Sequence, residues 1–150
     1  MDWQLTTSIA STALAVGAFA LSVVTYVRAE REKVRYGKRE FLTESNYLSD
    51  RFLAGMMAFK AVQEMSTFEE QVVPVLKDLL KLKSRSTRWK DDPLYAEFNN
   101  LLTSIADAGE KFELFFKNQI ELPELAASLD EAMRSAAKYS AYSRDRLLAL

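Results

Sequence analysis

The chain opens with a long stretch that carries no charge, and apolar residues then recur at helical spacing to its end. From Trp3 to Val27 there are 25 uncharged residues in a row. As an α-helix they would span roughly 37 Å, against about 30 Å for the hydrocarbon core of a bilayer. Within it, the apolar run from Ala13 to Val24 is interrupted only by Gly17 and Ser22. Residues 1–27 are therefore predicted to form a transmembrane anchor.

Three alternatives to a membrane anchor fit this stretch less well. A cleaved export signal would begin with basic residues and end at small ones, whereas this stretch begins Met-Asp-Trp-Gln and ends Tyr26-Val27-Arg28. A soluble amphipathic helix would present a charged face, which residues 13–27 lack. A ligand-binding bundle released by cleavage would begin near Ala29. The membrane anchor is the preferred interpretation.

Charge is distributed unevenly about the apolar stretch. Residues 28–40 hold six basic and three acidic side chains, and no Lys or Arg precedes them. By the positive-inside rule, a very short N-terminus lies outside the cell membrane and the rest of the chain is cytoplasmic. Residues 28–40 are predicted to form a basic juxtamembrane collar that sets topology and meets lipid headgroups, through Arg28, Arg31, Lys33, Arg35, Lys38 and Arg39.

Small residues recur in the predicted anchor at steps of three and four, as a stripe of four residues and as a second close-approach pair. Small side chains let helices approach closely in lipid, where packing drives their association. The pattern predicts helix packing within the membrane, either with a second copy or with another subunit. The stripe consists of Ser11, Ala15, Ala18 and Ser22, and the pair consists of Ala13 and Gly17.

Four amphipathic helices are predicted within residues 41–150. The first extends to about Met65 and the second starts at Ser66, which forms a capping-box pattern with Glu69. Pro74 predicts a kink or a late helix start. The segment SRSTRWKDDP is predicted to be a loop before a third helix, with Asp91 or Asp92 as N-cap and Pro93 first in the helix. The third helix stops before Leu122-Pro123, where the fourth begins.

These helices predict an all-α fold, in which a single N-terminal transmembrane helix is followed by an antiparallel up-down bundle of about four helices. Counted from Lys38, the first helix has about 27 residues and the second only about 18, or roughly 40 Å and 27 Å. One side of the bundle is therefore expected to be short. The loop after the second helix would then end roughly 13 Å short of Lys38.

Composition removes most enzymatic chemistry. The chain has no cysteine and no histidine, so thiolate nucleophiles, thiolate metal sites and imidazole chemistry are excluded. Carboxylate pairs such as Glu40/Glu44 and Glu110/Glu113 lie beside Lys or Arg and fit solvated faces. No phosphate-binding, dinucleotide-binding or calcium-binding loop is recognisable. No enzyme, catalytic residue, metal site, cofactor or small-molecule substrate is expected, and a net charge of −1 gives no reason to expect nucleic acid.

Two sets of side chains stand out as candidates for contact with other molecules. One is a candidate docking patch: five loop residues, which could also complement a helix C-terminus, and two aromatics off the apolar stripes, namely Lys83, Arg85, Arg88, Trp89, Lys90, Phe116 and Tyr142. The other could line a hydrophobic pocket, although core packing is the preferred interpretation; its members are Phe112, Phe115, Phe116, Tyr139 and Tyr142.

The function expected from these features is interaction at a membrane. The chain is predicted to be a membrane-anchored helical-bundle scaffold, adaptor or accessory subunit of a membrane complex. Its partners would be membrane lipid and other protein subunits, with self-association through the anchor as one form. The alternative is a membrane-perturbing, holin-like effector whose anchor oligomerises into a pore regulated by the bundle. Polar residues that could line water motivate it, namely Thr6, Thr7, Ser8, Ser11 and Thr12.

Overall fold

The computed structural model describes the backbone of residues 3–150 and the side chains of residue 11 and residues 13–150. All regular structure in this range is helical. The chain divides into two compact units, Met1–Lys38 and Arg39–Leu150. The all-α prediction, with a long apolar helix near the N-terminus and a helical bundle, is confirmed.

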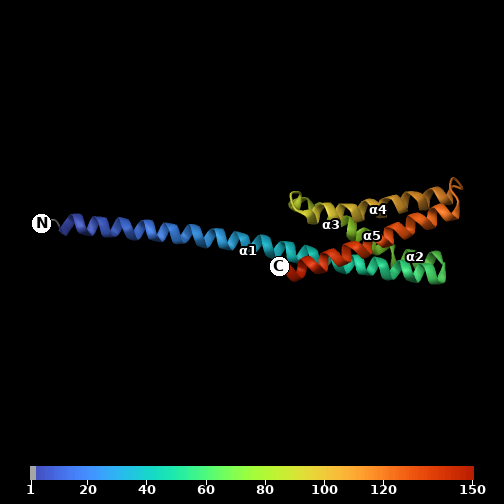
Figure 1. The fold of residues 1–150 in the computed structure, drawn as a ribbon, viewed down its shortest axis with the longest axis horizontal. Coiled ribbons are helices and arrows are strands. Elements are labelled where there is room, and N and C mark those ends of the chain that lie inside the picture. The colour runs from blue at the N-terminus through green and yellow to red at the C-terminus, as the bar shows by residue number, and fades with distance from the viewer. Residues whose placement is uncertain (1–2) are drawn as a thin grey trace. The chain divides into compact units, whose positions relative to one another are not determined.

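The first helix is much longer than the others. It is α1 (Trp3–Val62), and it continues through Gly37 without a break. The second unit contains the last part of α1 together with α2 (Met65–Gln71), α3 (Val73–Ser86), the short 3₁₀ helix η1 (Thr87–Trp89), α4 (Pro93–Phe116) and α5 (Leu122–Ala149) (Figure 1).

Contacts between side chains show that the neighbouring helices of the second unit are antiparallel. Along α1 and α5, Ser45 bonds to Tyr139 and Lys60 pairs with Asp130, so the numbering rises on one helix as it falls on the other. Along α4 and α5, Lys111 pairs with Glu124 while Lys138 approaches Glu97. The C-terminal end of α5 therefore lies beside the start of α4 and beside α1 where it enters the unit.

An aromatic cluster forms the centre of the bundle. The Phe98 ring lies edge-on to Phe41, with ring centroids 5.1 Å apart, and 5.5 Å from the Tyr139 ring. All three side chains are buried, as are Leu42 and Leu101. These residues come from α1, α4 and α5, so burial of this cluster joins three helices into one core.

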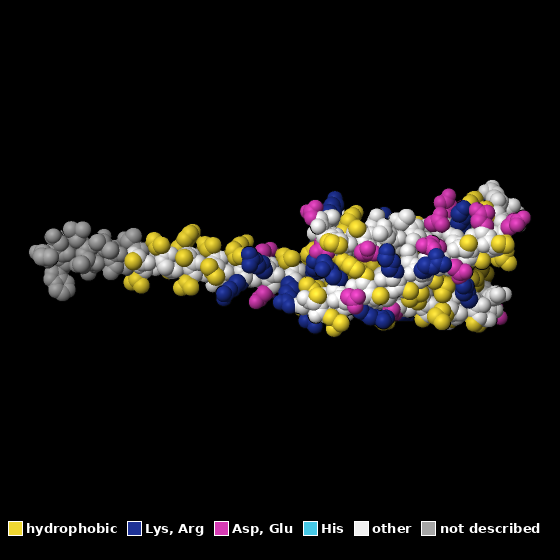
Figure 2. Space-filling model, in the orientation of Figure 1, with side chains coloured by type: hydrophobic (Ala, Val, Ile, Leu, Met, Phe, Trp, Pro, Cys, Tyr) yellow, Lys and Arg dark blue, Asp and Glu magenta, His cyan; other side chains and the backbone are white. Residues whose placement is uncertain are grey.

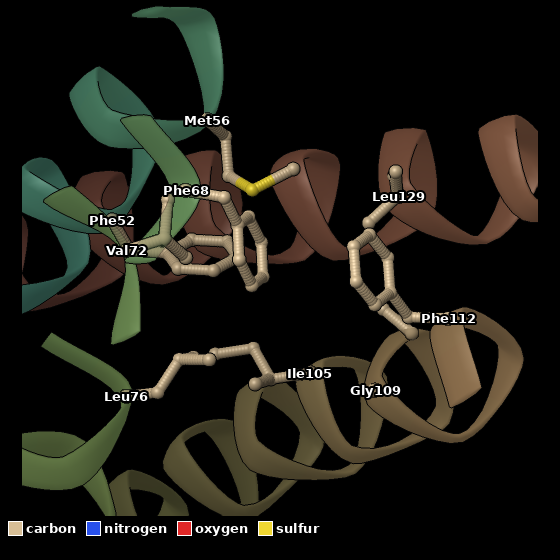
Figure 3. A pocket seen from close by; sticks show the side chains of 10 residues that line it. Phe52, Met56, Phe68, Val72, Leu76, Ile105, Gly109, Phe112 and Leu129 are labelled. Carbon is tan, nitrogen blue, oxygen red and sulfur yellow. The ribbon is translucent and has the colours of Figure 1, made fainter. Parts of the chain in front are cut away.

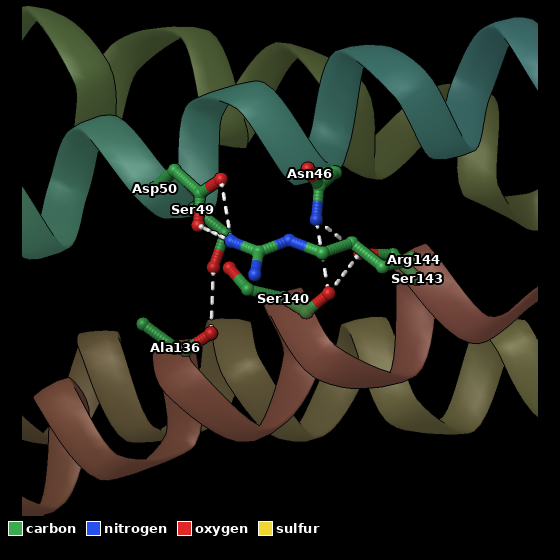
Figure 4. Close-up of polar contacts among 7 residues, drawn as sticks. All are labelled: Asn46, Ser49, Asp50, Ala136, Ser140, Ser143 and Arg144. Atoms are coloured by element: carbon green, nitrogen blue, oxygen red, sulfur yellow. Dashed lines mark hydrogen bonds and ion pairs between the residues drawn. The ribbon is translucent and has the colours of Figure 1, made fainter. Parts of the chain in front are cut away.

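Small and hydroxylated side chains join α1 to α5. Ser49 donates a hydrogen bond to the carbonyl of Ala136 (2.8 Å), and Asn46 donates to the carbonyl of Ser140 (3.0 Å) (Figure 4). On the exposed side of this contact, Nη2 of Arg144 donates to both carboxylate oxygens of Asp50, at 2.9 and 3.0 Å. Since a buried polar group without a partner is unfavourable, these bonds fix the register of the two helices.

The Tyr139 hydroxyl is held by a serine of α1. It lies 2.7 Å from the Ser45 hydroxyl, which also lies 3.3 Å from the Leu42 carbonyl. Burial raises the pKa of the Tyr139 phenol above its usual range, so the group stays neutral at physiological pH. Its role is that of a hydrogen-bonding member of the core.

Ser45→Ala is expected to destabilise the bundle more than Tyr139→Phe. The alanine leaves a buried phenol without its partner and should lower the free energy of unfolding by about 2 kcal/mol. The phenylalanine leaves Ser45 its bond to the Leu42 carbonyl and should cost about 1 kcal/mol. Chemical denaturation of both variants and of the double variant measures the difference. Equal losses would show that the phenol has another partner.

Helix boundaries agree with the local signals in two places. Asp92 is the N-cap of α4 and accepts a hydrogen bond from the Leu94 amide at 2.9 Å, with Pro93 first in the helix. The predicted start of the fourth helix at Leu122-Pro123 is also confirmed. Pro74 predicted either a kink or a late helix start, and the structure has a helix start: α3 begins at Val73, with Pro74 in its first turn.

The predicted end of the first helix and the predicted start of the second are both wrong. The capping box at Ser66 does not form, because α1 already ends at Val62 and α2 begins at Met65 with Glu64 as its N-cap. Gln63 adopts a left-handed conformation (φ 56°) and its amide bonds to the Phe59 carbonyl, which ends α1 early.

The predicted loop SRSTRWKDDP is mostly helical. The hydroxyls of Ser84, Ser86 and Thr87 each donate to a carbonyl three residues back, so α3 continues to Ser86 and passes into η1. The predicted shortfall of this segment relative to Lys38 is wrong as well. Arg85 pairs with Glu44 and lies 3.9 Å from Glu40, two residues after Lys38 along α1.

Candidate interaction surfaces

The apolar part of α1 in the first unit is exposed around the helix. The helix from Ala13 onward contains an 18-residue window that is long and apolar enough to cross a membrane, and none of that window is buried. Large side chains in it are well exposed, for example Leu14 at 74% and Phe19 at 73%. A helix that is apolar on every side is typically surrounded by lipid or buried in a protein interior.

Two hydroxyl groups of this segment donate hydrogen bonds to carbonyls of the helix itself. Ser22 donates to the Ala18 carbonyl at 2.9 Å, and Thr25 donates to the Leu21 carbonyl at 2.8 Å. Such bonds lower the free-energy cost of placing a hydroxyl in lipid. Four of the side chains that motivated a water-lined pore lie outside the described residues, namely Thr6, Thr7, Ser8 and Thr12.

The small-residue stripe and the basic collar are both on the surface of α1. Every stripe residue from Ser11 to Ser22 is exposed, and an added Cβ at Gly17 would meet no atom within 4 Å. The collar is exposed from Arg28 to Tyr36, and Lys38 is half-buried. Packing of the stripe against another helix and contact of the collar with headgroups stay predictions.

The seven candidate docking residues do not form one surface. Five lie in or after α3, and Tyr142 shares their end of the bundle because its ring lies under Arg146, which pairs with Asp92. Phe116 lies at the opposite end, at the last residue of α4. Arg85 is engaged by Glu44, and Trp89 packs against the core, so Lys83, Arg88 and Lys90 are the exposed cations of the set.

An apolar groove opens at the end of the bundle where α4 passes into α5. We call it the distal groove, and it consists of two adjoining hollows that share Phe112 and Leu129. The inner hollow, of about 230 Å³, lies between α1, the α2–α3 region, α4 and α5, and is lined by Phe52, Met56, Phe68, Val72, Leu76, Ile105, Ala108, Gly109, Phe112 and Leu129 (Figure 3). The outer one, of about 430 Å³, is lined by Phe59, Lys60, Gln63, Met65, Phe112, Phe115, Phe116, Leu122, Leu125, Ala126 and Leu129.

The structure divides the five aromatics between core and surface differently from the prediction. Tyr139 is in the core and Phe116 is exposed, as expected, but Phe112 and Phe115 line the groove beside Phe116, and Tyr142 packs against the core. The rings of Phe68 and Phe112 stack at 4.9 Å, and Phe116 lies edge-on to Phe112 at 5.0 Å. The available sequence signal was a glycine, Gly109, on the apolar stripe of a long helix, four residues after Ile105 and three before Phe112.

Three ion pairs lie at this end of the bundle. Lys117 donates to Glu113 at 2.6 Å and lowers the pKa of that carboxyl. Lys111 donates to Glu124 at 2.9 Å, and this bond raises the pKa of the lysine. Lys60, on α1, pairs with Asp130. Among residues with described side chains, no group of three acidic residues is placed to hold a metal ion.

Alanine is expected to have opposite effects at two glycines of the bundle. A Cβ at Gly109 would meet nothing within 4 Å, so Gly109→Ala should raise the free energy of unfolding by about 0.5–1 kcal/mol through helix propensity. A Cβ at Gly55 would lie 3.0 Å from the Gln71 carbonyl oxygen and 3.1 Å from Val72, so Gly55→Ala should lower it by about 1 kcal/mol. Thermal denaturation of the two variants side by side measures this; a common direction would contradict the packing at Gly55.

The fold and surfaces define an all-helical protein with one long apolar helix near its N-terminus and a helical bundle. No protein-family model, curated protein or solved structure matches the chain.

Proposed function

We propose that this protein is a single-pass membrane protein with a short external N-terminus, which holds its helical bundle at the cytoplasmic face as an interaction module. The bundle would act as a scaffold, adaptor or accessory subunit of a membrane complex. The observation that carries the proposal is the exposure of large apolar side chains around α1 from Leu14 to Val27. In lipid this surface is removed from water, whereas in solution it would drive aggregation.

The orientation follows from the basic collar. All positive charge near the apolar segment lies on its C-terminal side, at residues 28–39. Translocation of so many Lys and Arg residues is disfavoured, so the bundle stays in the cytoplasm. Tyr26 lies beside the collar and suits the headgroup level.

The role as an interaction module is supported by what the bundle displays. Its centre is closed by a well-packed aromatic cluster, and its surface combines charged residues with an open apolar groove at one end. Exposed apolar grooves on soluble domains are typical sites of contact with other molecules. The anchor would bring such contacts to the membrane.

A protease-protection experiment tests this arrangement. With an epitope at each end of the full chain, protease added to sealed vesicles with the cytoplasmic side inward should remove the N-terminal epitope and spare the C-terminal one. Vesicles of the opposite orientation provide the control and should give the reverse pattern. Removal of the C-terminal epitope from the first vesicles would overturn the topology.

A further inference from the structure

The inner hollow of the distal groove has room for a side chain larger than that of Gly109. Gly109 lies within α4, faces the inner hollow and has no atom within 4 Å of the position of an added Cβ (Figure 3). Its φ is not positive, so no backbone strain requires a glycine there. A glycine inside a helix costs about 1 kcal/mol relative to alanine. Here that cost keeps a hollow of about 230 Å³ open, and a cavity of about 150 Å³ already accommodates benzene.

The outer hollow continues this room to the surface. Phe116 is 58% exposed, Leu122 is 62% exposed and Met65 is 38% exposed. They come from α4, α5 and α2, so the exposed apolar surface lies in a channel between helices. Phenylalanine and methionine walls adapt to different apolar side chains, as in surfaces that bind amphipathic helices.

The end of the bundle that contains the groove is strongly acidic. Residues 58–70 and 107–130, which form this end of the bundle, contain nine acidic and three basic side chains. Each base is already paired, Lys60 with Asp130, Lys111 with Glu124 and Lys117 with Glu113. Among the side chains that the structure describes, six carboxylates of this end have no ion pair, namely Glu64, Glu69, Glu70, Asp107, Glu110 and Glu121. Acidic and hydrophobic side chains gather together where α4 passes into α5 (Figure 2).

From these observations we infer that the distal groove binds a basic amphipathic helix of another protein. A large apolar side chain of that helix fills the inner hollow beside Gly109, and further apolar side chains cover Phe116 and Leu122. Its Lys and Arg residues meet Glu64 and Glu121, which adjoin the lining residues Gln63, Met65 and Leu122. The inference names the partner chemistry of the proposed interaction module and rests on that proposed function.

The same charges disfavour the other occupants. An anionic lipid or fatty acid would bring a negative headgroup to an acidic rim, and a second copy docking by the same face would oppose two sets of like charges. A helix with apolar residues at i, i+3, i+4 and i+7 and basic residues on its flanks satisfies both the channel and the rim.

Selection from a peptide library tests the inference. The probe is a phage-displayed library of 20-residue helix-forming peptides, panned on the full chain in nanodiscs of zwitterionic lipid, with empty nanodiscs as the blank. Enriched sequences should carry net positive charge and apolar residues at helical spacing. Enrichment of acidic or neutral peptides, or of none, would overturn the inference.

Variants of the groove then locate the binding. Gly109→Leu fills the inner hollow and should weaken binding of the enriched peptides at least tenfold without lowering the melting temperature, while Gly109→Ala, which leaves most of the room, serves as its control. Phe116→Ser changes an exposed side chain and should weaken binding several-fold. Unchanged affinity in both Gly109→Leu and Phe116→Ser would place the peptides elsewhere and sink the idea.

Two double variants that remove the same charge test whether the carboxylates beside the groove contribute to binding. Glu64→Gln with Glu121→Gln, beside the groove, should weaken binding several-fold and reduce its salt dependence. Asp91→Asn with Asp145→Asn, at the opposite end of the bundle, removes the same charge and should leave binding unchanged. Equal effects of the two pairs would contradict the rim. These results are independent of membrane fractionation, so the groove and the membrane anchor can fail separately.

Discussion

Phe98→Ala is expected to lower the free energy of unfolding of the bundle by about 3–5 kcal/mol. The Phe98 side chain is fully buried, and its ring contacts Phe41 and Tyr139 at centroid distances of 5.1 and 5.5 Å. Its removal leaves a cavity where α1, α4 and α5 meet. Because domains are stable by only about 5–15 kcal/mol, a large share of the molecules should unfold on mild heating.

Trp89 provides the measurement, because it packs against the core and its fluorescence should follow unfolding in urea. Phe116→Ala is the matched control: the same atoms are removed from a ring that is 58% exposed, and a loss below about 1 kcal/mol is expected. A loss at Phe98 no larger than the loss at Phe116 would contradict the position of the core.

Val16→Arg is expected to release the full chain from the membrane. Val16 lies near the middle of the apolar segment and is 63% exposed. Arginine at the centre of a spanning helix is less favourable than valine by about 3 kcal/mol, which corresponds to about a hundredfold in an equilibrium constant. The measurement is the share of protein that stays with membranes after alkaline extraction.

Val34→Arg is the control for this experiment. Val34 lies on the same helix, within the basic collar, and is 49% exposed, so another arginine there should leave the membrane fraction unchanged. If Val16→Arg also stayed with the membranes, α1 would not be the anchor, and the proposed function would fail.

Signals that act over a few residues were predicted well. Pro93 and Pro123 mark helix starts because proline fits the first turn of a helix and not its interior, and Asp92 caps α4 through its own carboxylate. The uncharged run from Trp3 to Val27 likewise needs no distant residue to be recognised.

Predictions that depend on competition between alternatives were less successful. The capping box at Ser66 does not form because α1 ends early, just before Gln63. The left-handed backbone of Gln63 cannot be recognised from the side-chain pattern. The segment SRSTRWKDDP was predicted to be a loop. Its hydroxyls instead bond within the helix, and Arg85 reaches Glu44 on α1, 41 residues away.

The distal groove, too, could be predicted only in part from the sequence. Periodicity places Phe112, Phe115 and Gly109 on one long helix, but a stripe of apolar residues looks the same whether a neighbour covers it fully or leaves a hollow. Likewise, the acidic excess of this end is hidden by the near-zero net charge of the whole chain until the fold brings residues 58–70 beside residues 107–130.

The helical class, the apolar segment near the N-terminus and the charge asymmetry beside it can all be derived from the chain alone, because helix propensity, proline geometry and transfer to lipid act locally. Three features required the folded bundle: the register of α1 against α5, the reach of α3 to Glu44, and the opening of an acid-rimmed groove around Gly109. These depend on which side chains from distant segments share one space, and packing settles that for all of them together.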